Sequence, residues 1–140
     1  MAMVRKLVGL VVGASALAVA LHFIFSAFYE DAVDVDQIWS ILDVFMAIGV
    51  IVSLMVGYHL KRVTEGSGGD GVSRAYLEAN VLLYLAAFLS IWFFWNWFDD
   101  LVAGDAGQSD TRLILWAFID PLYVLVACAA GRRLLRSGSD

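Results

Sequence analysis

The sequence predicts an all-α integral membrane protein in which four transmembrane helices form an antiparallel bundle with both termini in the cytoplasm. Three observations lead to this prediction. Hydrophobic residues make up 61% of the 140-residue chain, whereas soluble domains are nearer to half apolar. Four separate apolar segments each approach the length of roughly 20 residues that a helix needs to cross a bilayer. Finally, nearly all basic residues fall on one side of the layout that these segments define.

The four segments make up a single transmembrane domain, and each carries at most one charged residue. They are residues 7–28, 38–60, 79–98 and 113–131. Arg5 and Lys6 precede the first segment, as basic residues do in a secretory signal. However, its uncharged run is 22 residues long, and a signal core usually has about 7–15 residues. We therefore expect the first segment to be retained as a membrane helix.

The third segment ends in a run of aromatic residues followed by Asp99 and Asp100. Tryptophan concentrates at the membrane–water interface because its ring is apolar while its N–H seeks a polar partner. We expect Trp92, Trp95 and Trp97 to be interface anchors. The alternative interpretation is that Trp92 and Trp95 line a groove for a quinone or a lipid together with Tyr29.

The distribution of basic residues predicts the orientation. Eight of the nine Lys and Arg residues flank the segments on one side, and Arg112 alone lies on the other. Because basic residues in short flanks stay in the cytoplasm, both termini are expected inside. The opposite loops are acidic, so they could attract cations or a basic partner, or simply be solvated. We expect a bacterial inner (cytoplasmic) membrane protein whose surroundings are the lipid bilayer, with no nucleic-acid partner.

Two of the predicted helices carry small residues at a spacing of four, which allows another helix backbone to approach closely. On the first helix these are Gly9 and Gly13, and on the second they are Gly49, Ser53 and Gly57. The first helix also has a polar side, with Ser15, His22, Ser26 and Tyr29. A helix with two such faces needs protein neighbours on both, which favours association with other membrane subunits or a homo-oligomer.

Asp43 and Asp120 are the costly residues of the predicted spans, because an acid in a span costs about 2.5–3.5 kcal/mol on insertion scales. They must face protein or water, or be protonated. His22 and Ser90 lie at a similar depth, about 10–13 Å below the outer boundary at 1.5 Å per residue. The sequence thus predicts one polar layer. Its use stays open: hydrogen bonds between helices, a proton or cation site, or a metal or redox site.

A weak internal repeat is visible in the chain. Residues 28–33 resemble residues 97–102, and each stretch leads into a helix that carries one acid and ends in a basic pair. A parallel duplication of one helical hairpin would produce this pattern. The ordinary rules of membrane-protein composition would produce it as well.

The chain has no nucleophile–base pair, zinc-ligand spacing or nucleotide-binding loop. We therefore favour a non-catalytic accessory or scaffold subunit of a larger membrane complex, or a homo-oligomer, with no cofactor indicated. One alternative is a small proton- or cation-coupled transporter or channel that uses Asp43 and Asp120. Another is a redox protein that binds a quinone, a haem or a metal. His22 and His59 lie near opposite faces, which disfavours a bis-histidine haem within one copy.

Overall fold

The computed structural model describes residues 2–65 and 72–136 and is helical along almost all of their length. Its helices are α1 (Ala2–Phe25), α2 (Val35–Glu65), α3 (Arg74–Ala103) and α4 (Asp110–Arg136), with short 3₁₀ turns η1 (Ser26–Phe28) and η2 (Gly104–Ala106). A glycine-rich stretch, whose composition is typical of a flexible linker, and a Ser/Gly-rich C-terminal tail fall largely on residues 66–71 and 137–140, outside the described residues.

All four α-helices are long and apolar enough to span a membrane, which confirms the prediction of an all-helical chain with four such helices. Large apolar side chains such as Leu21, Ile51, Ile91 and Leu125 are exposed along each of them. Soluble monomers rarely present so much contiguous apolar surface. These side chains are therefore positioned to contact lipid.

α2, α3 and α4 extend beyond the predicted apolar segments at both ends, because backbone hydrogen bonding continues past the last apolar residue. α1 begins earlier than predicted but ends at Phe25, where η1 follows. At the start of α2, Oδ1 of Asp34 accepts a hydrogen bond from the backbone N–H of Gln37 at 3.0 Å. Asp34 therefore caps α2. Ser73 caps α3 in the same way by accepting from the N–H of Tyr76 at 3.2 Å.

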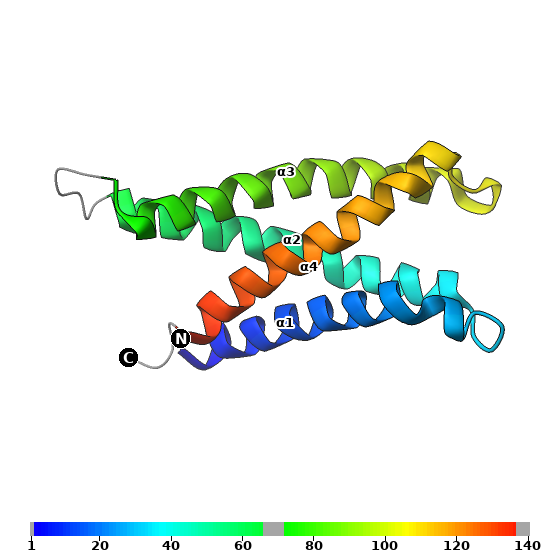
Figure 1. Cartoon of the computed structure of the whole chain (residues 1–140), viewed down its shortest axis with the longest axis horizontal. Coiled ribbons are helices and arrows are strands. Elements are labelled where there is room, and N and C mark those ends of the chain that lie inside the picture. Colours follow the sequence, from blue (N-terminus) through cyan, green and yellow to red (C-terminus); the bar gives the residue numbers. More distant parts are fainter. Residues whose placement is uncertain (1, 66–71, 137–140) are drawn as a thin grey trace.

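The helix partners do not follow chain order. Figure 1 shows α1 and α3 on the two sides of the molecule, while α2 and α4 cross between them. As a result α1 packs mainly on α4, and α3 packs mainly on α2. Both short connections, α1–α2 and α3–α4, lie at one end, which we call the loop end. The start of α1 and the end of α4 lie at the opposite end, which we call the basic end (Figure 1).

Glycine lets the helices approach closely at three points. A Cβ atom built on Gly49 would lie 2.9 Å from Cε2 of Tyr123, so α2 and α4 can cross here only without a side chain. A Cβ atom on Gly57 would lie 2.8 Å from Cα of Leu83 on α3. A Cβ atom on Gly9 would lie 3.1 Å from the backbone oxygen of Gly131 on α4.

The two hairpins, α1–α2 and α3–α4, bury equivalent positions. One constant offset relates buried residues of α1 to those of α3: Gly9 to Ala79, Val12 to Leu82, Ala16 to Ala86, and Val19 to Leu89. A second offset relates α2 to α4: Leu42 to Ile119, Asp43 to Asp120, Met46 to Tyr123, and Val50 to Ala127. Each hairpin also packs its first helix on the other hairpin's second helix. This arrangement supports the interpretation that the chain contains two copies of one hairpin.

Candidate functional site

The candidate site lies beside the crossing of α2 and α4. Tyr123, at the crossing, is fully buried, and its hydroxyl group is 2.6 Å from the hydroxyl group of Ser15 on α1. Toward the loop end, Asp120 lies about one turn before Tyr123 and Asp43 less than two turns before Gly49, at equivalent positions on α4 and α2. The crossing therefore places one carboxyl group from each hairpin in the bundle interior.

Both carboxyl groups are shielded from the surroundings. Asp43 is 5% exposed and Asp120 is 3% exposed. The two side chains interact electrostatically. Among the described residues, the Oδ1 atom of Asp120 is buried and has no hydrogen-bond partner. Two ionised carboxylates cannot share such an environment at low cost, so the pair needs a proton or a cation.

A line of acidic residues connects this pair with the loop end. Asp43 interacts electrostatically with Asp100 on α3, which is only partly buried. Asp100 in turn interacts with Asp36 and Asp99, near the start of α2 and the end of α3. Asp36 is exposed. Negative charge thus extends from the loop-end surface to the acid pair in the bundle.

Asn96 is a buried polar residue that the sequence analysis missed. It is fully buried one turn before Asp100, and its Nδ2 donates a hydrogen bond to the backbone oxygen of Arg112 at 3.3 Å. Its Oδ1 atom has no partner among the described residues. The signal was available, because Asn96 interrupts a run of aromatic residues one helical turn before an acid.

The α3–α4 connection is held in place around Asn96. The side chain of Gln108 donates to the backbone oxygen of Asn96 at 2.9 Å and accepts from Nε1 of Trp116 at 2.9 Å. Arg112 forms an ion pair with Asp99 at 3.3 Å and stacks on the ring of Trp95, 3.9 Å from its centroid. These contacts fix the loop end of α3, and with it the position of Asp100.

The partners of His22 are aromatic residues near the loop end. His22 is hydrogen-bonded to the hydroxyl group of Tyr29 and packs edge-on against Trp39, with ring centroids 4.5 Å apart. No ion pair joins it to Asp43 or Asp120 among the described residues. Trp39 precedes Asp43 by one turn, so His22 lies about 5 Å nearer the loop end. The reason is that α1 meets α2 only near their connection and then turns toward α4.

Ser90, the fourth member of the predicted layer, is satisfied within its own helix. Its hydroxyl group donates to the backbone oxygen of Ala86 at 2.6 Å. The side chain is only partly buried. Of the four predicted residues, Asp43 and Asp120 are therefore the two that the structure brings together.

The predicted packing residues find their partners within the chain. Gly49 and Gly57 contact α4 and α3, and Gly9 contacts α4. The hydroxyl group of Ser53 is fully buried and donates to the backbone oxygen of Gly49 at 2.7 Å. The backbone of Gly13 lies against Gly131 of α4, where an added Cβ atom would be 3.4 Å from the Gly13 nitrogen, but a Cβ atom on Gly13 itself would meet nothing within 4 Å.

The predicted interface anchors lie near the loop end of α3. Trp95 is 58% exposed and stacks with Arg112. Trp92 stacks on Phe118 of α4, with ring centroids 6.4 Å apart, and Trp97 packs against Phe93. Tyr29 contacts His22 on the α1 side. A groove shared by Tyr29, Trp92 and Trp95 has no support in these contacts.

The ligand set does not favour the metal or haem alternatives. Within residues 2–65 and 72–136, no three His, Cys, Asp or Glu side chains are grouped so that they could hold a metal ion. His59 is exposed in the last turns of α2, near the basic end, whereas His22 lies near the loop end.

Comparisons of the chain with protein-family models, curated proteins and solved structures find no match.

Proposed function

We propose that the protein resides in a bacterial inner membrane as an antiparallel four-helix bundle, with the basic end and both termini in the cytoplasm. The grouping of Arg5, Lys6, Lys61, Arg62, Arg74, Arg132, Arg133 and Arg136 at the basic end supports this orientation. Arg112 is the single Lys or Arg of the loop end, and it is paired with Asp99. The loop end then faces the outside.

We propose further that the protein is a non-catalytic subunit that binds a proton or a small cation at the Asp43–Asp120 pair. One observation carries this proposal: two interacting carboxyl groups are buried where α2 and α4 cross, and one of their oxygen atoms has no partner. An ionisable residue inside a membrane bundle is by default a functional candidate, because its insertion is costly.

The loop end is the proposed side of entry. The negative charges of three loop-end acids, Asp36, Asp99 and Asp100, would attract a cation or a proton toward Asp43. In the other direction, the bundle interior beyond the Ser15–Tyr123 hydrogen bond is lined by Val12, Ala127 and Ala130. Access from one side suits an ion-binding subunit that works with other membrane subunits, or as a homo-oligomer, better than a self-contained channel.

Infrared titration of the purified protein tests the proton site, because a protonated carboxyl group absorbs apart from a carboxylate. We expect the wild type to show a protonated-carboxyl band that is lost as the pH is raised. The D43N/D120N variant should lack the band. The matched control is Asp31→Asn, which removes an exposed loop acid and should leave the band unchanged.

Three outcomes of this titration are informative. A band that persists in D43N/D120N would contradict the proposal. Loss of assembly in D43N/D120N, with no titrating band in the wild type, would assign the acids a purely structural role. For a cation instead of a proton, the wild type should show a band shift on adding that cation which D43N/D120N lacks.

The association with other subunits is proposed on a second observation. Gly13 belongs to a small-residue face, but the space next to it is open within the chain. Gly13→Leu should therefore not disturb the monomer, yet it should reduce the oligomer or partner content in mild detergent. A particle of unchanged size and composition would argue against a partner at this face.

A further inference from the structure

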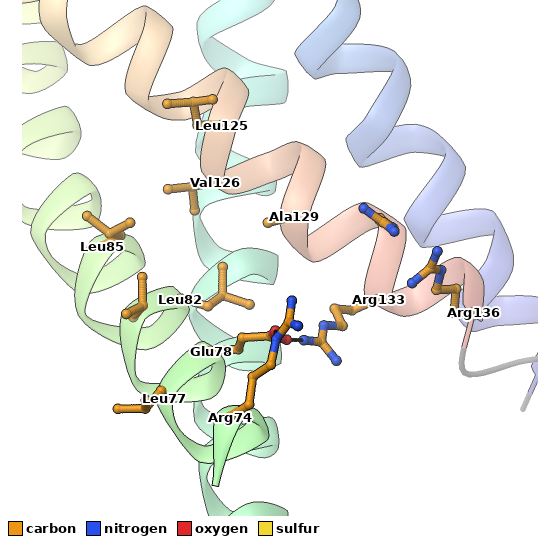
Figure 2. Close-up of a pocket in the computed structure, with 12 residues that line it drawn as sticks. Arg74, Leu77, Glu78, Leu82, Leu85, Leu125, Val126, Ala129, Arg133 and Arg136 are labelled. Atoms are coloured by element: carbon orange, nitrogen blue, oxygen red, sulfur yellow. Dashed lines mark hydrogen bonds and ion pairs between the residues drawn. The ribbon is translucent and has the colours of Figure 1, made fainter. Parts of the chain in front are cut away.

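A groove separates α3 from α4 at the basic end. It opens because α3 stays on α2 while α4 leans away toward α1 (Figure 1). Its volume is about 610 Å³, within the range of roughly 300–1,000 Å³ that is common for small-ligand sites. Figure 2 shows its apolar wall, formed by Leu77, Leu82 and Leu85 of α3 and by Leu125, Val126 and Ala129 of α4.

Arginine side chains surround the mouth of this groove. Arg74 from α3 and Arg132, Arg133 and Arg136 from α4 line it together with a single acid, Glu78. Arg74 donates from Nε to Oε1 of Glu78 at 2.8 Å, and Arg133 donates from Nη2 to Oε2 of Glu78. Figure 2 shows Glu78 between these two guanidinium groups. Glu78 thus holds Arg74 and Arg133 at the mouth, while arginine remains in excess.

We propose that this groove binds an anionic phospholipid, with an acyl chain along the apolar wall and the phosphate headgroup among the arginines. The long apolar wall and the charged mouth match the two parts of such a molecule. Arginine suits the headgroup because its planar guanidinium donates two hydrogen bonds to phosphate oxygens. Basic pockets between membrane helices at the cytoplasmic face are known to bind anionic headgroups in this way.

The general preference of basic residues for the cytoplasmic side does not by itself explain why arginines gather at the mouth of this groove. In the α1–α2 hairpin, the positions equivalent to Glu78 and Arg133 are Val8 and Val56. That hairpin carries its basic residues elsewhere: Lys61 forms an ion pair with Glu65 at 3.5 Å, and Arg62 lies over the ring of Tyr58. The two hairpins therefore fold alike but differ at the groove, which indicates a role specific to α3 and α4.

Native mass spectrometry of delipidated protein tests this proposal. The protein is titrated with phosphatidylglycerol and, separately, with phosphatidylcholine that has the same acyl chains. We expect wild type to prefer phosphatidylglycerol, and the R132Q/R133Q variant to bind it about tenfold more weakly. The matched control is K61Q/R62Q, which removes the same charge at the same end and should keep the preference. Equal binding of both lipids by wild type would overturn the proposal.

Three further arms separate the groove from a general charge effect. An equal loss of preference in R132Q/R133Q and K61Q/R62Q would overturn the proposal, because it would assign the effect to net charge. Ala129→Trp fills the groove without changing charge and should abolish phosphatidylglycerol binding; retained binding would contradict occupation of the groove. The single variant Arg132→Gln leaves the Glu78 ion pairs intact and should still weaken binding. Inorganic phosphate should not displace the lipid, and displacement would indicate a simple anion site instead.

Discussion

At the scale of single residues, the missing side chain of Gly49 lets α2 and α4 approach each other closely. Tyr123 fills the place that a Cβ atom would take, and its hydroxyl group reaches Ser15 on a third helix. A glycine on α2 therefore lets a tyrosine on α4 connect to α1. This three-helix contact lies about one turn after Asp120 and less than two turns after Asp43, and it holds the two helices that carry them.

Replacing Gly49 with alanine should destabilise the bundle. The added methyl group overlaps the Tyr123 ring, and such overpacking typically costs about 1–3 kcal/mol. Gly13→Ala is the matched control, because its methyl group meets open space. Alanine is favoured over glycine within a helix by about 0.5–1 kcal/mol, so this variant should be neutral or stabilised. Unfolding in detergent measures both, and equal stability of the two variants would contradict the crossing geometry.

The two acids show what residue-level reasoning can and cannot predict about a site. The cost of placing Asp43 and Asp120 in lipid indicated that both face protein, and their similar depth indicated that they could meet. The depth estimated from the sequence did not distinguish His22 from the two acids, because His22 lies only about one helical turn nearer the loop end. Hydrogen bonding of His22 to Tyr29 depends on how η1 folds the chain back, which no spacing along α1 reveals.

At the scale of the helices, the apolar segments predicted all four spans, but chain order did not predict their partners. Short connections make α1 and α2, and α3 and α4, adjacent at the loop end. Further along, each helix packs mainly on a helix of the other hairpin, because small residues favour those contacts. Gly131 meets Gly9 near the basic end. Both glycines were visible in the sequence, but a small residue does not indicate which other helix it contacts.

The pairing of α1 with α4 can be tested by a disulfide. A Cβ atom on Gly9 would lie 3.0 Å from Cβ of Leu134, close to the separation of about 3.5–4.5 Å in disulfides. In a Cys128→Ser background, which removes the exposed native thiol, G9C/L134C should cross-link within one chain on mild oxidation. G13C/L134C is the control and should stay reduced, because Gly13 faces open space. Efficient cross-linking of the control, or none in G9C/L134C, would contradict this pairing.

At the scale of the whole molecule, the two ends have different chemistry although the two hairpins are built alike. The loop end combines acidic residues with the tryptophan-rich end of α3, and the acids lead inward to the buried pair. The basic end carries the groove between α3 and α4. The proposed ion site and the proposed lipid site are therefore at different depths, and either one can be removed without touching residues of the other.

Reporter fusions test the orientation on which both proposals are placed. A reporter that works only in the cytoplasm should be active at the C-terminus and inactive at Gly104 in η2. A reporter that works only outside the cytoplasm should give the opposite result. The physical reason is that basic residues in short flanks resist translocation. The R132Q/R133Q variant should keep this orientation, because six of the eight basic residues of the basic end remain. Matching signals from the two fusion sites would contradict the four-span topology. An orientation reversed by R132Q/R133Q would show instead that these two arginines hold the topology, and lipid binding would then have to be measured on Arg132→Gln alone.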